Sequence, residues 1–317
     1  MEKLKNNGCS RRMVLKSAVT GFALFIAKTT GFYRLNAQAS RIGAAHQPFL
    51  IEGISTRDDA SSHHLLVKKV FEAAGGINRF IPPGSTVAIK PNISWARRPE
   101  YAATTNPEVL RSLVELCIDA GAKKVVIADN TIHDANRCFS LTGVSAVAKY
   151  TGAELIYPRP GIIREAEISG VRIKAWPVLT PFLEADVIIN VPVLKHHSLT
   201  GITGAMKNWI GAVGGSRWVL HQDIHQSIVD LAGFFRPAVT LVDATRILTR
   251  NGPSGGDLKA VTRLNRVILS NDQVAADARA AVLFGRIPGE IHYIRLAAEE
   301  GLGTMQIPDD MIKTVTL

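Results

Sequence analysis

Short, strongly apolar runs alternate along the chain with segments whose apolar residues recur at helical spacing. The clearest runs lie at residues 86–90, 123–130, 185–193, 238–245 and 265–272. Because they lack an alternating polar face, they are typical of strands buried on both sides of a sheet. Strands separated by helices favour a parallel arrangement. We therefore predict an α/β fold with three layers, in which a mainly parallel sheet carries helices on both faces and a peripheral hairpin.

Local signals place the first helix and the hairpin. Asn106 and Pro107 predict a helix N-terminus, and Gly121 predicts where that helix ends. The segment AEISGVRIKAWPV at 166–178 predicts a hairpin that turns at Ser169–Gly170. We expect this hairpin to lie at an edge of the main sheet.

The first residues differ from the rest of the chain. SRRMVLK at 10–16 precedes an apolar run at 18–27 and then the small-residue segment NAQAS at 36–40, which is the order of a secretory signal peptide. The pair Arg11 and Arg12 resembles the twin-arginine export signal. We therefore expect the twin-arginine export machinery as a partner and a periplasmic or otherwise exported location.

Cleavage is expected after Ala39, so residues 1–39 would be the signal peptide and residues 40–317 a single α/β domain. An uncleaved membrane anchor is the alternative. Against it, an apolar run of ten residues is short for a membrane span.

Charge argues against one class of partner. The formal net charge of the chain is +10, and residues 1–39 contribute +6 of it through seven Lys and Arg against Glu2, so the remainder is near +4. Blocks of five or six basic residues do not occur in the sequence. Such a mild and scattered charge does not predict binding to nucleic acid.

Cysteine is sparse. Beyond Cys9 in the predicted signal, the chain has Cys117 and Cys138. Two thiols cannot hold an iron–sulfur cluster with the usual four cysteine ligands, so we expect no intrinsic cluster of that kind. Cys117 falls on an apolar helical stripe and is expected in the core. A disulfide between Cys117 and Cys138 in an oxidising compartment stays open as an alternative.

Four of the predicted strands end in side chains that are common in functional sites. They are Lys90 and Asn92, then Asp129, then Lys195, His196 and His197, and finally Asp243. Ligands of open parallel sheets bind beyond the carboxyl ends of the strands, where the loops converge. Asp and Asn also end strands for reasons of turn chemistry alone. The coincidence of all four favours a shared site.

A glycine-rich segment follows the third of these strands. In TGITGAMKN, at 200–208, we expect Thr200, Gly201, Thr203 and Gly204 to precede a helix that starts near Ala205. Backbone N–H groups there would face an anion, and Lys207 would add positive charge. Gly204→Val should then abolish binding with little loss of folding. The alternative is a flexible gating segment without direct contacts.

His221 and His225 lie four residues apart, which would place both imidazoles on one face of a helix. This is the spacing of metal ligands. The alternative is that one histidine caps the helix while the other packs against the sheet. Because no Glu follows the first histidine, the pattern does not predict a metalloprotease.

Several stretches together carry a family resemblance, and they cover most of the chain from about Val87 to Gly303. They are VAIKPN, NVPVLKHHSLTGITGAMKNWIGAV, HQDIHQSIVDL, LVDAT, NGPSGG and SNDQVAADA. They resemble the domain-of-unknown-function 362 family. The resemblance implies a common α/β fold with a shared site, and no established reaction. Some relatives carry an added ferredoxin-like segment with cysteine ligands, which is missing here.

A second resemblance concerns the order of His197, two glycines, Lys207 and His221. It is similar to the amino-terminal domain of lactate racemase, whose glycine-rich segment holds a nickel-pincer nucleotide. The resemblance implies that His197 is a proton-transfer base or ligand and that Lys207 is the covalent attachment point. It also implies that His221 or His225 is a nickel ligand.

The leading hypothesis is an exported protein that binds a metal or a metal-containing anionic cofactor or ligand at this Lys, His and Asp site. His196, His197 and Lys207 are its catalytic candidates. One alternative is lactate-racemase-like proton or hydride transfer next to a carboxylate. Others are a non-catalytic module for small anionic solutes, and a redox accessory protein that works with an iron–sulfur partner.

Overall fold

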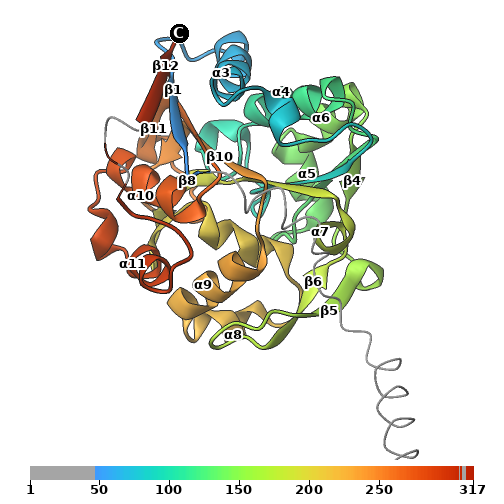
Figure 1. Cartoon of the computed structure of the whole chain (residues 1–317), viewed down its shortest axis with the longest axis vertical. Coiled ribbons are helices and arrows are strands. Elements are labelled where there is room, and N and C mark those ends of the chain that lie inside the picture. The colour runs from blue at the N-terminus through green and yellow to red at the C-terminus, as the bar shows by residue number, and fades with distance from the viewer. Residues whose placement is uncertain (1–46, 307, 309–311) are drawn as a thin grey trace, which may run out of the picture.

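The computed structural model describes residues 47–306, 308 and 312–317, so the predicted signal peptide at 1–39 lies outside the described residues. The described strands form a main sheet in the order β12-β1-β11-β10-β7-β2-β3-β4, and β8 pairs with both β10 and β9 (Figure 1). Their bounds are β1 Leu50–Ile54, β2 Thr86–Pro91, β3 Lys124–Ala128, β4 Glu154–Ile156, β7 Val187–Val191, β8 Val193–His197, β9 Gly201–Thr203, β10 Val239–Leu248, β11 Val261–Ser270 and β12 Ile312–Thr316.

Parallel pairing dominates one half of the sheet. Strands β10, β7, β2, β3 and β4 run parallel to one another, whereas β11 is antiparallel to both β10 and β1. The carboxyl ends of the five parallel strands therefore lie at one edge of the sheet. The predicted α/β fold with a mainly parallel sheet is confirmed.

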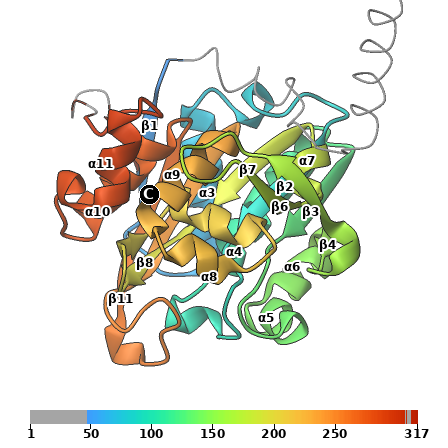
Figure 2. The same cartoon turned by 90° about the horizontal axis from the view of Figure 1, so that it is seen from below.

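Helices cover both faces of the sheet, as the two views show (Figures 1 and 2). Neighbouring strand residues enter opposite cores: Ile89 of β2 packs on one side, and Ala88 on the other. The side of Ile89 is covered by α3 Ala60–Ala73, α4 Pro107–Asp119, α5 Ala135–Leu141 and α6 Val144–Thr151. The side of Ala88 is covered by α7 Pro181–Glu184, α8 Arg217–His221, α9 Ile224–Phe234, α10 Gln273–Leu283 and α11 His292–Glu299.

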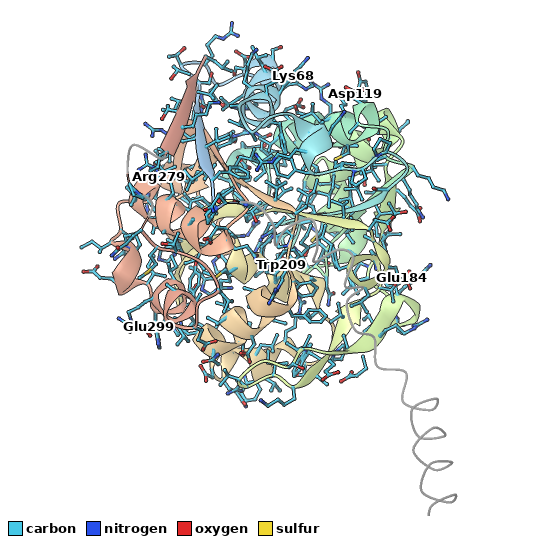
Figure 3. All side chains as sticks on the ribbon, viewed as in Figure 1. Lys68, Asp119, Glu184, Trp209, Arg279 and Glu299 are labelled. Carbon is cyan, nitrogen blue, oxygen red and sulfur yellow. The ribbon has the colours of Figure 1, made fainter. Side chains whose placement is uncertain are left out.

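Short 3₁₀ helices complete the described elements. They are η1 Ile77–Arg79, η2 Pro99–Tyr101, η3 Pro160–Ile162, η4 Met206–Ala212, η5 Leu258–Ala260 and η6 Pro288–Glu290. Trp209 of η4 lies deep in the molecule (Figure 3), where its ring stacks on that of Phe235 with centroids 4.7 Å apart. Burial of a large aromatic side chain holds η4 against the rest of the fold.

The predicted first helix is α4. The Asn106 side chain accepts a hydrogen bond from the Glu108 N–H, Pro107 occupies the first turn, and Gly121 follows the helix with a φ of 82°. The side chain of Asn caps a free N–H group, Pro suits the first turn, and Gly adopts the left-handed backbone that ends a helix.

The hairpin is present, but its expected position was wrong. β5 Ile163–Glu167 and β6 Ala175–Leu179 form a separate two-stranded antiparallel sheet instead of an edge of the main one. Asp230 of α9 explains this position, because its carboxylate accepts hydrogen bonds from three successive N–H groups of the turn, those of residues 171–173. The hairpin is thereby tied to the helical layer.

Three further expectations need correction. The strand at 185–193 does not end in a loop: after Pro192 the chain continues as β8, so Lys195, His196 and His197 are strand residues. Part of the glycine-rich segment is strand β9, and the helix that follows is the 3₁₀ helix η4. Both Cys117 and Cys138 are buried free thiols, so the alternative of a disulfide is not realised. Strands β1 and β12, at the two ends of the described chain, were not predicted.

Candidate functional site

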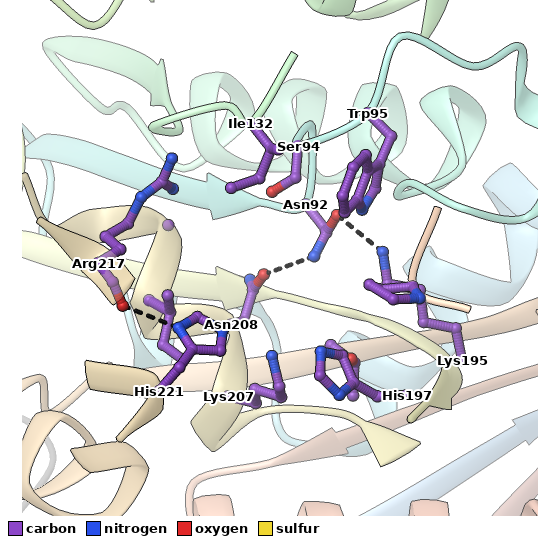
Figure 4. Close-up of a pocket in the computed structure, with 14 residues that line it drawn as sticks. Asn92, Ser94, Trp95, Ile132, Lys195, His197, Lys207, Asn208, Arg217 and His221 are labelled. Carbon is purple, nitrogen blue, oxygen red and sulfur yellow. Dashed lines mark hydrogen bonds between the residues drawn. The ribbon is translucent and has the colours of Figure 1, made fainter. Parts of the chain in front are cut away.

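A cavity of about 160 Å³ opens beyond the carboxyl ends of the parallel strands (Figure 4). Its walls come from the loops after β2 and β3, from β8 and β9, and from η4 and α8. The lining residues are Asn92, Ser94, Trp95, Ile132, Lys195, His197, Thr203, Lys207, Asn208, Ile210, Gly211, Arg217, His221 and Pro253. Segments more than a hundred residues apart in sequence thus share one pocket.

The lining is cationic. Lys195, Lys207 and Arg217 contribute three basic side chains, and the described residues that line the cavity include neither Asp nor Glu. Gathering like charges in a partly desolvated pocket without a counter-charge is unfavourable. The pocket is therefore electrostatically suited to an anion.

Lys90 and Asp129 form a buried ion pair beneath the cavity. The Lys90 Nζ lies 2.8 Å from Asp129 Oδ1, and both residues are fully buried. Asp129 Oδ2 accepts a hydrogen bond from the Ile93 N–H, and Lys90 donates to the Pro91 carbonyl. A Cβ at Gly211, which lines the cavity, would lie 2.1 Å from Asp129 Oδ1. The pair positions the floor of the site, and its charges largely compensate each other.

Lys195 is held by neutral acceptors. Its Nζ donates to the Ala103 carbonyl at 2.5 Å and to Asn92 Oδ1 at 3.3 Å. Burial, and secondly the charge of Lys207, lowers the pKa of Lys195 well below its ordinary value. The Lys195 amine is thus oriented by neutral oxygens, and no carboxylate of the described residues forms an ion pair with it.

Buried amides connect the strands below the pocket. Asn208 accepts a hydrogen bond from the Asn92 side chain and donates to Asn190 Oδ1 at 2.9 Å. Sequence reasoning singled out Asn92 but missed Asn208 and Asn190. The signal available for Asn208 was its place directly after Lys207.

Lys207 differs from the other cations. It is 9% exposed, and within the described part of the chain its ammonium group has neither a hydrogen bond nor an ion pair. Burial, and secondly the charge of Arg217, lowers its pKa to about 8. In Figure 4 its Nζ projects between His197 and His221. Lys207 therefore presents a free amine to the cavity.

Arg217 was missed by sequence reasoning. Its guanidinium donates to the carbonyls of Asn130 at 2.6 Å and Thr131 at 3.0 Å, which fixes it on the loop after β3. The only sequence signal was a basic residue after the pair Gly214 and Gly215, which does not by itself indicate a ligand contact.

His197 and His221 carry their protons on different ring nitrogens. His197 Nδ1 accepts a hydrogen bond from the Leu199 N–H, so the proton of the neutral ring is on Nε2. Burial and the charges of Lys207 and Lys195 lower the pKa of His197 to about 2, which keeps the ring neutral. His221 Nδ1 lies 2.8 Å from the Arg217 carbonyl, which can only accept. In its neutral form, His221 Nε2 is therefore an acceptor that receives no hydrogen bond from the described part of the chain.

Other predicted site residues lie outside the cavity lining. Asp243 is buried, and its carboxylate accepts hydrogen bonds from the Asn106 N–H and from the N–H and hydroxyl of Thr245. His196 accepts a hydrogen bond from the Gly252 N–H. The Thr200 hydroxyl donates to the Ile202 carbonyl. These side chains support neighbouring backbone, so the predicted binding role of Asp243 and Thr200 and the catalytic role of His196 are not supported by the pocket.

The expected anion cradle of the glycine-rich segment is occupied by the protein itself. The N–H groups of Ala205 and Met206 donate to the two oxygens of Asp277. A Cβ at Gly204 would lie 2.0 Å from Asp277 Oδ1, so glycine is required there for packing. Gly201, with a φ of 76°, serves a turn. Of this segment's four predicted contacts, only Thr203 lines the cavity. The expectation that Gly204→Val would spare folding was therefore wrong.

The predicted metal pair is separated. His221 ends α8, whereas His225 lies in α9, because the backbone leaves helical geometry at Asp223. The His225 ring packs against His292, with centroids 4.5 Å apart, away from the cavity lining. Among the described residues, no group of three or more His, Cys, Asp or Glu side chains could hold a metal ion.

Within residues 47–306, 308 and 312–317, no helix combines the length and the apolar character needed to cross a membrane.

The solved structures similar to this chain include two distant ones. A protein of Thermotoga maritima is 10% identical with a TM-score of 0.43, over 76% of this chain and 59% of that one. The lactate racemase apoprotein of Thermoanaerobacterium thermosaccharolyticum is 14% identical with a TM-score of 0.43, over 79% of this chain and 58% of that one. The chain thus spans less than two thirds of either structure.

Sequence comparison gives a clearer result. A thylakoid-associated protein of Synechocystis is 26% identical over 253 residues, which cover 77% of this chain and 76% of that protein. Residues 87–282 match a family known as Domain of unknown function, DUF362, and this range contains the whole lining of the cavity. The chain therefore belongs to the DUF362 family.

Proposed function

We propose that this protein binds a small anionic ligand, with a carboxylate or phosphate group, in the cavity between β8, η4 and α8. The observation that carries the proposal is the uncompensated charge of Lys195, Lys207 and Arg217 around one pocket. Lys195 and Arg217 donate hydrogen bonds to neutral backbone carbonyls and to one side-chain amide, and Lys207 has no acceptor among the described residues. A bound anion would supply the missing counter-charge, which makes binding favourable.

The remaining lining sets the size and shape of the ligand. Trp95, Ile132 and Ile210 supply apolar surface beside the cations, and Ser94 and Thr203 supply hydroxyls. The Thr203 Oγ1 is buried without a hydrogen-bond partner among the described residues. A small ligand with one anionic group and a short apolar or hydroxylated part matches these walls.

The test is thermal unfolding of the full chain with increasing inorganic phosphate or oxalate, at constant ionic strength set with chloride. Binding to the native state raises the Tm, and at a hundred times the Kd the gain is about 2.7 kcal/mol. Lys195→Met and Lys207→Met should each weaken the apparent affinity at least about tenfold, as expected for a charged hydrogen bond of ~1.5–3 kcal/mol. Lys149→Met, at an exposed position, is the matched control. Equal shifts in all variants, or none with either anion, would refute the proposal.

A second candidate function is proton transfer next to a carboxylate, as in the lactate-racemase-like hypothesis. The observation that favours it is the complementary pair of histidines: His197 offers an N–H and His221 a free ring nitrogen in the same pocket. General acid–base groups of this kind typically accelerate a reaction by a factor of about 10²–10⁴. Protein purified from its native source would be incubated with lactate in D₂O, and deuterium at the carbon beside the carboxylate followed by NMR. Exchange that is lost in His221→Gln supports catalysis. Binding of lactate without exchange would support anion binding as the only function.

We also propose that the protein is exported through the twin-arginine route. The support is the order of Arg11 and Arg12, the apolar run and the small residues before Ala39.

A further inference from the structure

We propose that Lys207 forms an imine with the carbonyl carbon of an anionic aldehyde or ketone, such as a 2-oxo acid, held in the cavity. The inference rests on the proposed anion-binding function, and it names the class of ligand more closely. The observation behind it is a buried primary amine without a protein partner, placed between two cations and two histidines.

Three lysines lie at or beneath the pocket, and only one has a free amine. Lys90 contacts Asp129, the Pro91 carbonyl and Asn208. Lys195 donates to Ala103 and Asn92. In the described residues, Lys207 has no such acceptor. An amine must lose its proton and keep its lone pair available in order to attack a carbonyl, so Lys207 is the one suited to this step.

Burial also favours the neutral amine. Because desolvation and the Arg217 charge lower the pKa of Lys207 to about 8, roughly a tenth of the molecules carry the free base at pH 7. Nucleophilic lysines are commonly activated by an apolar pocket or a neighbouring cation.

The other cations would hold the anionic end of the same ligand. Arg217 is fixed on the carbonyls of residues 130 and 131, and Lys195 is fixed on the opposite wall in Figure 4. A carboxylate bound to either would keep the adjacent carbonyl carbon in a pocket of about 160 Å³, close to Lys207. Such confinement converts the attack into an effectively intramolecular step.

His221 can carry the protons of this step. The Lys207 lone pair forms the C–N bond and one proton moves from that nitrogen to the carbonyl oxygen, which gives a carbinolamine. The second proton then moves from nitrogen to the hydroxyl, which leaves as water and gives the imine. His221 Nε2 can accept each proton from nitrogen and pass it to oxygen, while the neutral His197 Nε2–H can donate a hydrogen bond to that oxygen. One water is released, and neither oxidant nor reductant is consumed.

The test is reductive trapping on the full chain at pH 7.5 with glyoxylate and sodium cyanoborohydride, followed by intact mass and peptide mapping. The expected result is one carboxymethyl group on Lys207, formed at least about tenfold faster than modification of the exposed Lys149. Prior saturation with inorganic phosphate should slow the labelling of Lys207 and leave Lys149 unaffected. Lys207→Arg keeps the positive charge and should lose the fast adduct.

The possible outcomes separate the two proposals. A phosphate-induced rise in Tm without selective labelling of Lys207 overturns the imine and leaves anion binding in place. If neither phosphate nor oxalate raises the Tm and labelling is unselective, both proposals fail. If Lys207→Arg does not fold, the imine proposal is still tested by the effect of phosphate on the unaltered chain. Labelling of Lys207 that phosphate does not slow would contradict the inference.

Discussion

At the scale of single residues, the pocket combines cations that are held in different ways. Lys90 is paired with a carboxylate, Lys195 with carbonyl and amide oxygens, and Lys207 with no group of the described chain. The less compensated a buried charge is, the more it destabilises the folded protein. An uncompensated buried cation such as Lys207 is therefore better explained by ligand binding than by a contribution to stability.

Lys207 is therefore expected to oppose folding at neutral pH. Its folded pKa of about 8 is below the ordinary 10.5, so the native state binds fewer protons than the unfolded state between these values. The penalty is fully present below pH 8 and disappears above 10.5. Lys207→Met should therefore raise the free energy of unfolding in urea by about 2–3 kcal/mol at pH 7, and by less at pH 9.5. A gain that does not shrink with pH would contradict the assignment.

At the scale of elements, Asp277 of α10 fastens the start of η4. Its carboxylate accepts the N–H groups of Ala205 and Met206, directly before Lys207. Burial raises the pKa of Asp277 to about 7, although these hydrogen bonds oppose the shift. The segment that carries Lys207 is thus positioned by a carboxylate that titrates near neutral pH.

The sign of this shift gives a second prediction. Since the folded pKa of Asp277 is above its ordinary 3.8, the native state binds more protons between pH 3.8 and 7. Its contribution to stability is complete below 3.8 and is lost as the pH rises through 7, by up to ~4 kcal/mol. Asp277→Asn cannot titrate, so the difference in Tm between the variant and the unaltered chain should change across pH 4–8. A constant difference would show that Asp277 does not titrate there.

At the scale of the whole molecule, the parallel half of the sheet creates the site. Because β2, β3 and β7 end at the same edge, loops from three parts of the chain meet there, and β8 with η4 closes the cavity. The two apolar cores on either side of the sheet keep this edge rigid. The site is built on strands, and its geometry follows from their order.

The proposed export concerns the entire molecule. Replacing Arg11 and Arg12 together with Lys should hold the protein in the cytoplasm of its host, since the twin-arginine machinery reads that pair. Cell fractionation and the intact mass of the periplasmic form would show transport and removal of residues 1–39. Unchanged transport of the double variant would contradict the route.

Sequence pattern alone determined the layers, the cap of α4 and the ends of β2 and β3 where Lys90, Asn92 and Asp129 lie, because apolar periodicity and turn residues act over short distances. Lys195 and His197 lie within β8, and Asp243 lies within β10, so their predicted places at strand ends were wrong. Only the tertiary structure decided which of these side chains meet. It brought in Arg217 and Asn208, moved Asp243 into a supporting position and gave the expected anion cradle to Asp277. Hydrogen-bond partners far apart in sequence leave no local signal, so whether a polar residue is free for a ligand is set by packing.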